Sequence, residues 1–324
     1  MIRVSLLLVS LTITNLIAQP SLPAFQAPPA TPELFGAGII STHFSERDFA
    51  LSPDGTEIFY TLQMPLASFQ TILYVKKQPD GRWTKPVIAP FAGRYSDLEP
   101  AFSSDGNKLF FASNRPLSGD KIKDFDLWVV ERNKTGWGQP KNLGKPINTE
   151  GDEFYPSITH SGNLYFTASY TTAIGKEDIF VAYHEAGTFK DPVPLDTAIN
   201  SKTYEFNAFV APDESFIIFT SYGRKDDTGR GDLYISRRDA NGKWLPAKNL
   251  KPINSDRLDY CPFVSFDRKS FFFTSERNTL QKSFPNKPVT IEELTHKLMS
   301  PQNGSGDLYW MSFDALLESL QNVN

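Results

Sequence analysis

Cysteine is nearly absent from this 324-residue sequence, in which Cys261 is the single example. No disulfide can therefore form within the chain, and the fold must be held together by packing. The surrounding residues, Tyr-Cys-Pro-Phe-Val, are typical of a buried strand, so they predict a packed thiol rather than a reactive one.

Several kinds of functional motif are missing as well. The four histidines are scattered and lack the spacing of a zinc site, and the sequence contains neither a Gly-x-Ser-x-Gly nucleophile elbow nor a phosphate-binding loop. Positive charge is not in excess, because the formal net charge is -4. A nucleic-acid-binding surface is therefore not expected.

Long hydrophobic runs are also lacking, apart from one near the N-terminus. A single positive charge, Arg3, precedes an apolar stretch from Val4 to Ile17 that is too short to span a bilayer comfortably. We interpret residues 1–18 as a secretory signal peptide and the proline-rich residues 19–32 as a linker. Because Leu16 stands where cleavage prefers a small residue, an uncleaved anchor is the alternative. The sequence thus predicts a periplasmic or secreted protein with no stable membrane span after cleavage.

The most prominent feature that is present is an internal repeat of roughly fifty residues, which occurs five times. Each copy contains a tight-turn sequence related to Ser-Pro-Asp-Gly, and the turn positions are Asp54, Asp105, Ser161, Asp213 and Asp267. An aromatic-rich run such as Ile58-Phe-Tyr-Thr61 follows each turn, and a further run such as Asp126-Leu-Trp-Val129 follows a loop of variable length. Runs of this composition around a tight turn indicate a β-hairpin extended by a third strand.

A fourth element, for example Trp83-Thr-Lys-Pro86, closes each of the first four copies. Its prolines fit an outer edge strand, where a missing N–H is not needed by a neighbour. The fifth copy lacks this element, whereas a spare stretch from Leu34 to Ser41 precedes the first copy. We therefore predict an all-β fold for residues 33–324, a five-bladed β-propeller of four-stranded antiparallel blades whose N-terminal strand completes the last blade. Removing residues 33–41 should then be more damaging than their surface position suggests.

The Ser-Pro-Asp-Gly turn, the Phe/Tyr strand after it and the returning Gly-Asp-Leu-Tyr resemble the WD40-like β-propeller repeats of TolB-type proteins over nearly all of residues 33–313. The resemblance implies the propeller fold and a place in the cell envelope. It implies little about activity, because the repeat occurs in translocation proteins, envelope proteins and the propeller halves of serine peptidases. The six blades of TolB itself are not matched, since five are countable here.

An acidic residue opens every repeat. The five acids, which mark the starts of the blades, are Glu46, Asp97, Glu153, Glu205 and Asp259. At the mouth of one channel they would repel one another unless they were paired, hydrogen-bonded, protonated or shared by a cation. One interpretation is structural, with backbone N–H groups or arginines as partners, and Arg115, Arg277 and Arg224 or Arg230 as plausible mates. The other is that the acids bind a ligand together with Arg115 and Arg277.

A second acid follows in the first two repeats only, at Asp48 and Glu99. If this stretch is extended, a period of two puts both acids of a repeat on the same side. Such a carboxylate cluster suits Ca²⁺ or Mg²⁺, with Asp48 and Glu99 as candidate metal ligands. It also suits glycoside hydrolysis, for which the candidate catalytic residues are Glu46, Asp48, Asp97 and Glu99. Fivefold repetition of the first acid counts against catalysis, because a catalytic pair needs two different environments.

The loops between second and third strands are the most individual part of the sequence, above all the insertion at residues 278–306. It contains Thr290-Ile-Glu-Glu293, a capping box that predicts a short helix to about Met299. A loop of this length is usually functional, and a simple lid is the alternative.

Together these features predict a non-catalytic, exported binding or scaffold propeller that recognises a protein or a polysaccharide of the cell envelope on its loop-rich channel face. The alternative is a carbohydrate-active enzyme that uses acids at the channel mouth. No cofactor is expected other than the calcium ion considered above.

Overall fold

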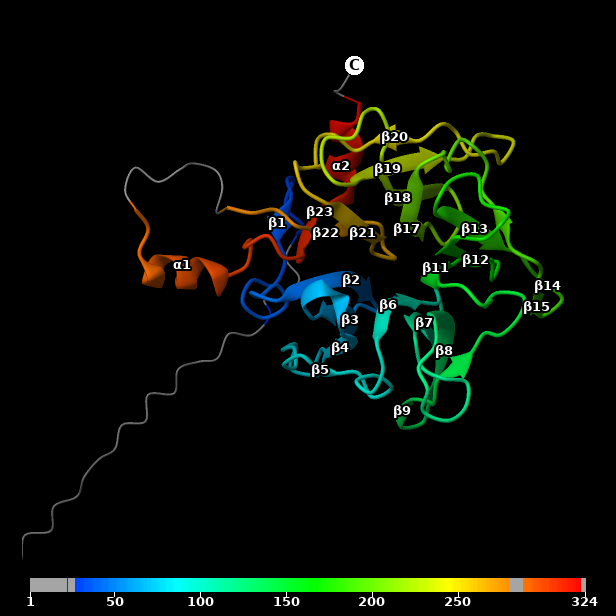
Figure 1. Ribbon diagram of the computed structural model, residues 1–324, viewed down its shortest axis with the longest axis horizontal. Helices are drawn as coiled ribbons and strands as arrows, with labels where there is room; N and C mark the ends of the chain where they lie inside the picture. The colour runs from blue at the N-terminus through cyan, green and yellow to red at the C-terminus, as the bar shows by residue number, and fades with distance from the viewer. Residues whose placement is uncertain (1–21, 23–26, 280–287, 322–324) are drawn as a thin grey trace, which may run out of the picture.

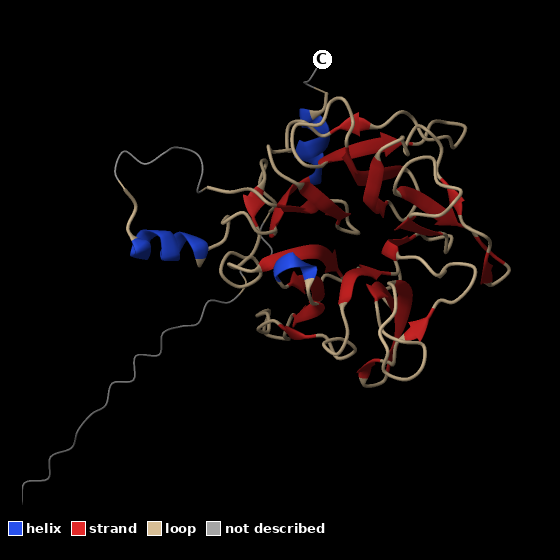
Figure 2. Ribbon diagram, viewed as in Figure 1, coloured by secondary structure: helices blue, strands red, loops and turns tan. Residues whose placement is uncertain are grey.

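The computed structural model describes residue 22, residues 27–279 and residues 288–321. Five antiparallel sheets surround a central axis, and Figures 1 and 2 show them as a ring. The first strands of neighbouring sheets contact one another around the axis. The prediction of an all-β, five-bladed propeller is confirmed.

Each sheet has four main strands, which follow one another from the axis outward. The first blade is β2 (Ser45–Leu51), β3 (Glu57–Gln63), β4 (Gln70–Lys76) and β5 (Val87–Ile88). The second is β6 (Asp97–Phe102), β7 (Lys108–Ser113), β8 (Asp126–Asn133) and β10 (Lys141–Asn142), with β9 (Gly136–Trp137) also paired to β8. The third is β11 (Glu153–Ile158), β12 (Leu164–Ala168), β13 (Asp178–Ala182) and β16 (Val193–Pro194), next to a small hairpin of β14 (His184–Glu185) and β15 (Thr188–Phe189). The fourth is β17 (Tyr204–Val210), β18 (Phe216–Tyr222), β19 (Asp232–Arg237) and β20 (Lys248–Asn249), and the fifth is β21 (Asp259–Val264), β22 (Ser270–Ser275), β23 (Asp307–Ser312) and β1 (Glu33–Leu34).

The aromatic-rich second strands form the core between blades. All six residues of β22 are buried, because both faces of this strand are covered by neighbouring sheets. Between the first two blades the ring of Phe59 meets that of Phe102 at a centroid distance of 5.6 Å, and both belong to a cluster that includes Phe111. The apolar runs of the repeat therefore supply the packing that replaces disulfides.

The repeated turn aspartates stabilise their own hairpins. The Oδ1 atom of Asp54 accepts hydrogen bonds from the Ser52 hydroxyl at 2.6 Å and from the Thr56 N–H at 3.1 Å. Equivalent bonds form at Asp105 and Asp267. The turn motif is therefore a local requirement of a tight hairpin.

The asparagines that end the outer segments make the hydrogen bonds that a neighbouring strand would otherwise make to the third strand. The side chain of Asn148 accepts from the N–H of Leu127 and donates to its carbonyl, both at 2.9 Å. Asn200 and Asn254 do the same in the next two blades. One side-chain amide thus fixes the start of each third strand where the outer strand is short.

The N-terminal segment completes the fifth blade, as predicted. Strand β1 pairs with β23, with Glu33 opposite Trp310 and Leu34 opposite Tyr309. The following residues continue the contact, since Phe35 N–H donates to the Leu308 carbonyl. Figure 1 shows β1 beside β23 although the two are far apart in the sequence.

Helices are few among the described residues. The capping box at Thr290 is confirmed, and it opens α1 (Ile291–Leu298), which projects from the fifth blade (Figure 1). A single 3-10 turn, η1 (Pro65–Ala67), follows β3, and α2 (Phe313–Ser319) packs behind β22 and β23. Among the described residues, no helix combines the length and apolar character needed to cross a membrane. The predicted signal peptide lies outside the described residues, as does most of the first half of the linker.

Candidate functional site

The five repeated acids are buried at the starts of the innermost strands, and they bind the loops that lead into those strands. In four blades the carboxylate accepts a backbone N–H and a hydroxyl from the residue four positions earlier. The pairs are Thr42 with Glu46, Thr149 with Glu153, Ser201 with Glu205 and Ser255 with Asp259. These bonds satisfy carboxylates that have lost their water.

Arginines after the second strands pair with three of these acids, as expected. Arg115 Nη2 lies 2.5 Å from Asp97 Oδ1, Arg224 Nη2 lies 3.0 Å from Glu205 Oε1, and Arg277 Nη2 lies 3.5 Å from Asp259 Oδ1. The same arginine atoms also donate to carbonyls of the preceding outer segment, such as that of Phe91. The acids and arginines therefore connect neighbouring parts of the scaffold, and their role in ligand binding stays a prediction.

A second ring of residues lies deeper in the channel, where each innermost strand contains a β-bulge. The pairing register shifts there in all five blades. The bulge residues have φ between 49° and 60°, and they are Asp48, Glu99, Tyr155, Asn207 and Cys261. The bulge interrupts the alternation expected for an extended strand, so Glu46 and Asp48 make separate contacts. A positive φ at non-glycine residues is costly, and fivefold repetition shows that the fold requires it.

The bulge residues and Arg47 close the channel with a buried polar network. The guanidinium of Arg47 donates from Nε to Asp48 at 2.8 Å and from Nη2 to Glu99 at 2.9 Å. The other Glu99 oxygen accepts from the Tyr155 N–H at 2.7 Å. Burial and the Asp48 charge raise the pKa of Glu99 to about 8, against the effect of Arg47. Arg47 thus holds two carboxylates that are almost fully buried.

Replacing this arginine should destabilise the protein strongly. We expect Arg47→Met to lower the free energy of unfolding by about 3–5 kcal/mol, because it leaves Asp48 and Glu99 buried without their counter-ion. The loss should be larger at pH 8 than at pH 5, since protonation neutralises Glu99 at the lower pH. Urea denaturation at the two pH values measures both effects.

Two further variants test the cause. Adding Glu99→Gln to the arginine variant should recover part of the loss, because it removes one unpaired charge. Arg94→Met is the matched control, as Arg94 pairs with Asp120 on the exposed surface and should change stability by less than about 1 kcal/mol. An Arg47→Met protein as stable as the control would contradict the account of the network.

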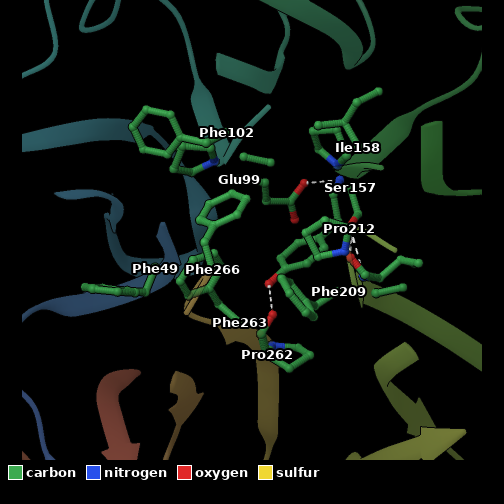
Figure 3. Close-up of a pocket in the computed structure, with 16 residues that line it drawn as sticks. Phe49, Glu99, Phe102, Ser157, Ile158, Phe209, Pro212, Pro262, Phe263 and Phe266 are labelled. Carbon is green, nitrogen blue, oxygen red and sulfur yellow. Dashed lines mark hydrogen bonds between the residues drawn. The ribbon is translucent and has the colours of Figure 1, made fainter. Parts of the chain in front are cut away.

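Beyond this network, on the side of the hairpin turns, the channel contains a small apolar cavity (Figure 3). Its walls include Phe49, Phe209 and Phe263, and Glu99 lies at its edge. The cavity measures about 40 Å³, which is room for about three water molecules. A sugar ring does not fit there, so we turn to the opposite mouth of the channel.

That mouth is on the face formed by the loops entering the innermost strands and the loops between second and third strands, which we call the loop face. Three charged residues there break the fivefold repeat, namely Arg47, Glu177 and Glu276. The positions equivalent to Arg47 hold Leu98, Phe154, Phe206 and Tyr260. Those equivalent to Glu177 hold Gln70, Phe125, Gly231 and Gly306, and those equivalent to Glu276 hold Gln63, Asn114, Ser169 and Tyr222. The five repeated acids bind the scaffold in every blade, whereas Glu177 and Glu276 stand at positions that carry no acid in the other blades.

The two glutamates are half-buried, and neither side chain has a hydrogen bond or ion pair with a described residue. Burial, and after it the nearby charge of Asp152, raise the pKa of Glu177 to about 7. Burial also raises the pKa of Glu276, but there the positive charges of Arg230, Arg47 and Arg257 oppose the effect. The mouth therefore contains two carboxyl groups in unlike electrostatic surroundings.

These three residues are absent from the candidates that the sequence suggested. The sequence signal for them is a departure from the repeat. Aligning the five copies position by position identifies Arg47, Glu177 and Glu276 as charged residues whose equivalents in the other blades carry no such charge. Residues that recur stand out first in a repeat sequence, and recurrence is the property of scaffold residues.

A calcium site at Asp48 and Glu99 gains no support from the donor set. Ca²⁺ takes about six to eight oxygen ligands. Here Arg47 already neutralises the two carboxylates, and the residues that the structure describes contain no group of three or more His, Cys, Asp or Glu side chains placed to hold a metal ion.

Comparison with known proteins gives a likeness of fold. No family model and no curated protein matches the sequence. Among solved structures, a glycoside hydrolase aligns with a TM-score of 0.52 at 8% identity, covering 86% of this chain and 91% of the other. A complex of BT0996 and RGII aligns with a TM-score of 0.50 at 8% identity, covering 89% and 91%. The α-L-arabinofuranosidase PaAbf62A of Podospora anserina, in complex with cellotriose, aligns at 0.49 and 12% identity, covering 88% and 94%.

These findings correct two expectations. The resemblance to WD40-like, TolB-type repeats is wrong, because no such family model matches and the fold aligns with a glycoside hydrolase. The Ser-Pro-Asp-Gly turn misled because any tight hairpin of this geometry benefits from an aspartate that binds its own backbone. The expectation of a non-catalytic binding or scaffold propeller is corrected as well, because the fold aligns with that of a solved glycoside hydrolase. At this identity the likeness establishes a shared five-bladed propeller fold.

Proposed function

We propose that the protein cleaves glycosidic bonds of a polysaccharide at the loop-face mouth of its channel. The observations that carry the proposal are two half-buried carboxyl groups on the loop face whose side chains lack scaffold partners: Glu177, whose charge acts on Glu99, and Glu276, on which the charge of Arg47 acts. Glycoside hydrolysis needs one carboxylic acid and one carboxylate on either side of the scissile bond, and their environments must differ.

The surroundings suggest a role for each glutamate. The pKa of Glu177 is raised to about 7, so a large fraction of its carboxyl groups is protonated at neutral pH and can donate a proton to the leaving oxygen. Glu276 lies among arginine charges that favour its ionised form, so it serves as the carboxylate that attacks the sugar or activates a water. The charge of Arg47 also favours that ionised form.

Two further points support the proposal. The fold aligns with that of a glycoside hydrolase over most of both chains. The N-terminal residues have the pattern of a secretory signal, so we propose that the protein acts in the periplasm or outside the cell, on a polysaccharide of the cell envelope or its surroundings.

The test is reducing-sugar release from a panel of neutral and acidic polysaccharides and oligosaccharides. We expect turnover of at least one member, and Glu276→Gln should lower kcat by about 10²–10⁴-fold, because the amide keeps the shape of the side chain and loses the charge. Glu150→Gln, which changes an exposed acid on the same face, is the matched control and should retain activity. Absence of turnover across the panel, or full activity of Glu276→Gln, would refute the proposal.

A further inference from the structure

Arg230 presents a free guanidinium beside the proposed site. It lies in the loop between β18 and β19, at a position that holds Asp124, Lys176 and Ser305 in other blades. Its side chain is exposed and makes no ion pair or hydrogen bond with any part of the chain that the structure describes. The carbonyl of Gly231 accepts from the Asp259 N–H and that of Leu258 accepts from the Glu276 N–H, so the loop and Glu276 meet at the same edge of the fifth blade. The charge of Arg230 also acts on Glu276.

The backbone on both sides of Arg230 is held closely against the fifth blade. A Cβ atom at Gly229 would lie 2.3 Å from the carbonyl oxygen of Arg257, and one at Gly231 would lie 2.6 Å from the Leu258 side chain. Only glycine allows this approach, so the loop is pressed onto its neighbour. The guanidinium is therefore carried on a fixed backbone, which lowers the entropy lost when it binds a ligand.

An aromatic residue lies at the start of the same loop, next to the pairing of Ser221 with Asp232. Tyr222, at the position equivalent to Glu276, is 48% exposed, and its ring centre lies 6.0 Å from that of Tyr204. The ammonium group of Lys176 lies 4.9 Å from the centre of the Tyr204 ring. Tyr222 is thus an exposed aromatic ring at the base of the Arg230 loop, and the Lys176 ammonium group adds positive charge over the neighbouring Tyr204 ring, in a protein whose net charge is -4.

We infer that this part of the loop face binds a uronate, a sugar that carries a carboxylate, with Arg230 on the carboxylate and Tyr222 against the face of the ring. A guanidinium matches a carboxylate with two parallel hydrogen bonds, a geometry that a neutral sugar cannot supply. It also offsets the repulsion between the sugar carboxylate and Glu276. The inference rests on the proposed function and adds the substrate class.

The experiment compares trigalacturonate with its fully methyl-esterified form by calorimetric titration, since the ester keeps the sugar and removes its charge. The protein should bind the acid at least about tenfold more tightly than the ester. Arg230→Gln should remove about tenfold of the affinity for the acid and leave that for the ester unchanged. Lys225→Gln, an exposed charge on the same loop, is the matched control and should keep the preference.

Equal affinity for acid and ester, no binding of either, or an equal loss for both in Arg230→Gln would overturn the inference. The last result would show that Arg230 acts only by adjusting Glu276. The polysaccharide panel separates this failure from that of the proposed function. Turnover of neutral members without a uronate preference would leave the hydrolase standing, whereas a uronate preference without any turnover would leave a binding site alone.

Discussion

Replacing Glu177 with glutamine is expected to lower kcat by about 10²–10⁴-fold while the protein remains folded, because the amide cannot donate a proton to the leaving oxygen. Removing a half-buried acid with a raised pKa should not destabilise the fold, since the neutral form is the one that burial favours. Initial rates on the best substrate of the panel, together with a melting curve, measure both quantities.

The dependence on pH gives a second signature of Glu177. Its pKa is raised to about 7, so the protonated form is lost as the pH rises through that value. We therefore expect kcat of the parent protein to fall above about pH 7, and the Glu177→Gln variant to lose this alkaline limb. The Glu150→Gln control should keep the parent profile. A Glu177→Gln protein with parental kcat and the same alkaline limb would rule out the assignment of Glu177 as the acid.

Deleting residues 33–41 is expected to cost about 5 kcal/mol or more, which is comparable with the whole stability of a typical domain. The deletion removes β1 from the edge of β23, and it removes the buried side chains of Phe35 and Ile40. The ring of Phe35 lies 5.2 Å from those of Phe49 and Phe272, so it joins the first blade to the fifth. Without it the propeller ring is open and exposes a strand edge.

A point substitution isolates the packing part of this effect. Phe35→Ala should lower the free energy of unfolding by about 3–5 kcal/mol. Phe44→Ala removes the same kind of side chain just after this segment, but Phe44 is 48% exposed, so the change should stay near 0.5 kcal/mol. Equal effects of the two substitutions in urea denaturation would contradict the closure account.

The architecture could be predicted because each blade repeats the same local rules. Turn aspartates such as Asp54, the aromatic second strands and the prolines of the outer segments each restrict the chain within a few residues, and five copies agree. The missing fourth element of the last copy and the spare segment before the first left one way to close the ring. The capping box at Thr290 is predictable for the same reason, since its bonds are local.

The site could not be predicted in this way. The bulges that point Asp48 and Glu99 into the channel need a positive φ. The five bulge residues are of five different types, so no local residue preference predicts this conformation. The pairing of Arg47 with Glu99 joins two blades across 52 residues. Strict alternation was the simplest assumption for this stretch, and the bulge breaks it.

The number of blades, the order of strands and the closure follow from the sequence, because hydrophobic period and turn chemistry act over short distances. Which carboxylates serve the scaffold and which face the mouth depends on how the blades are brought together. Charge acts through space, so the environments of Glu177 and Glu276 depend on residues from four different blades that the ring brings together.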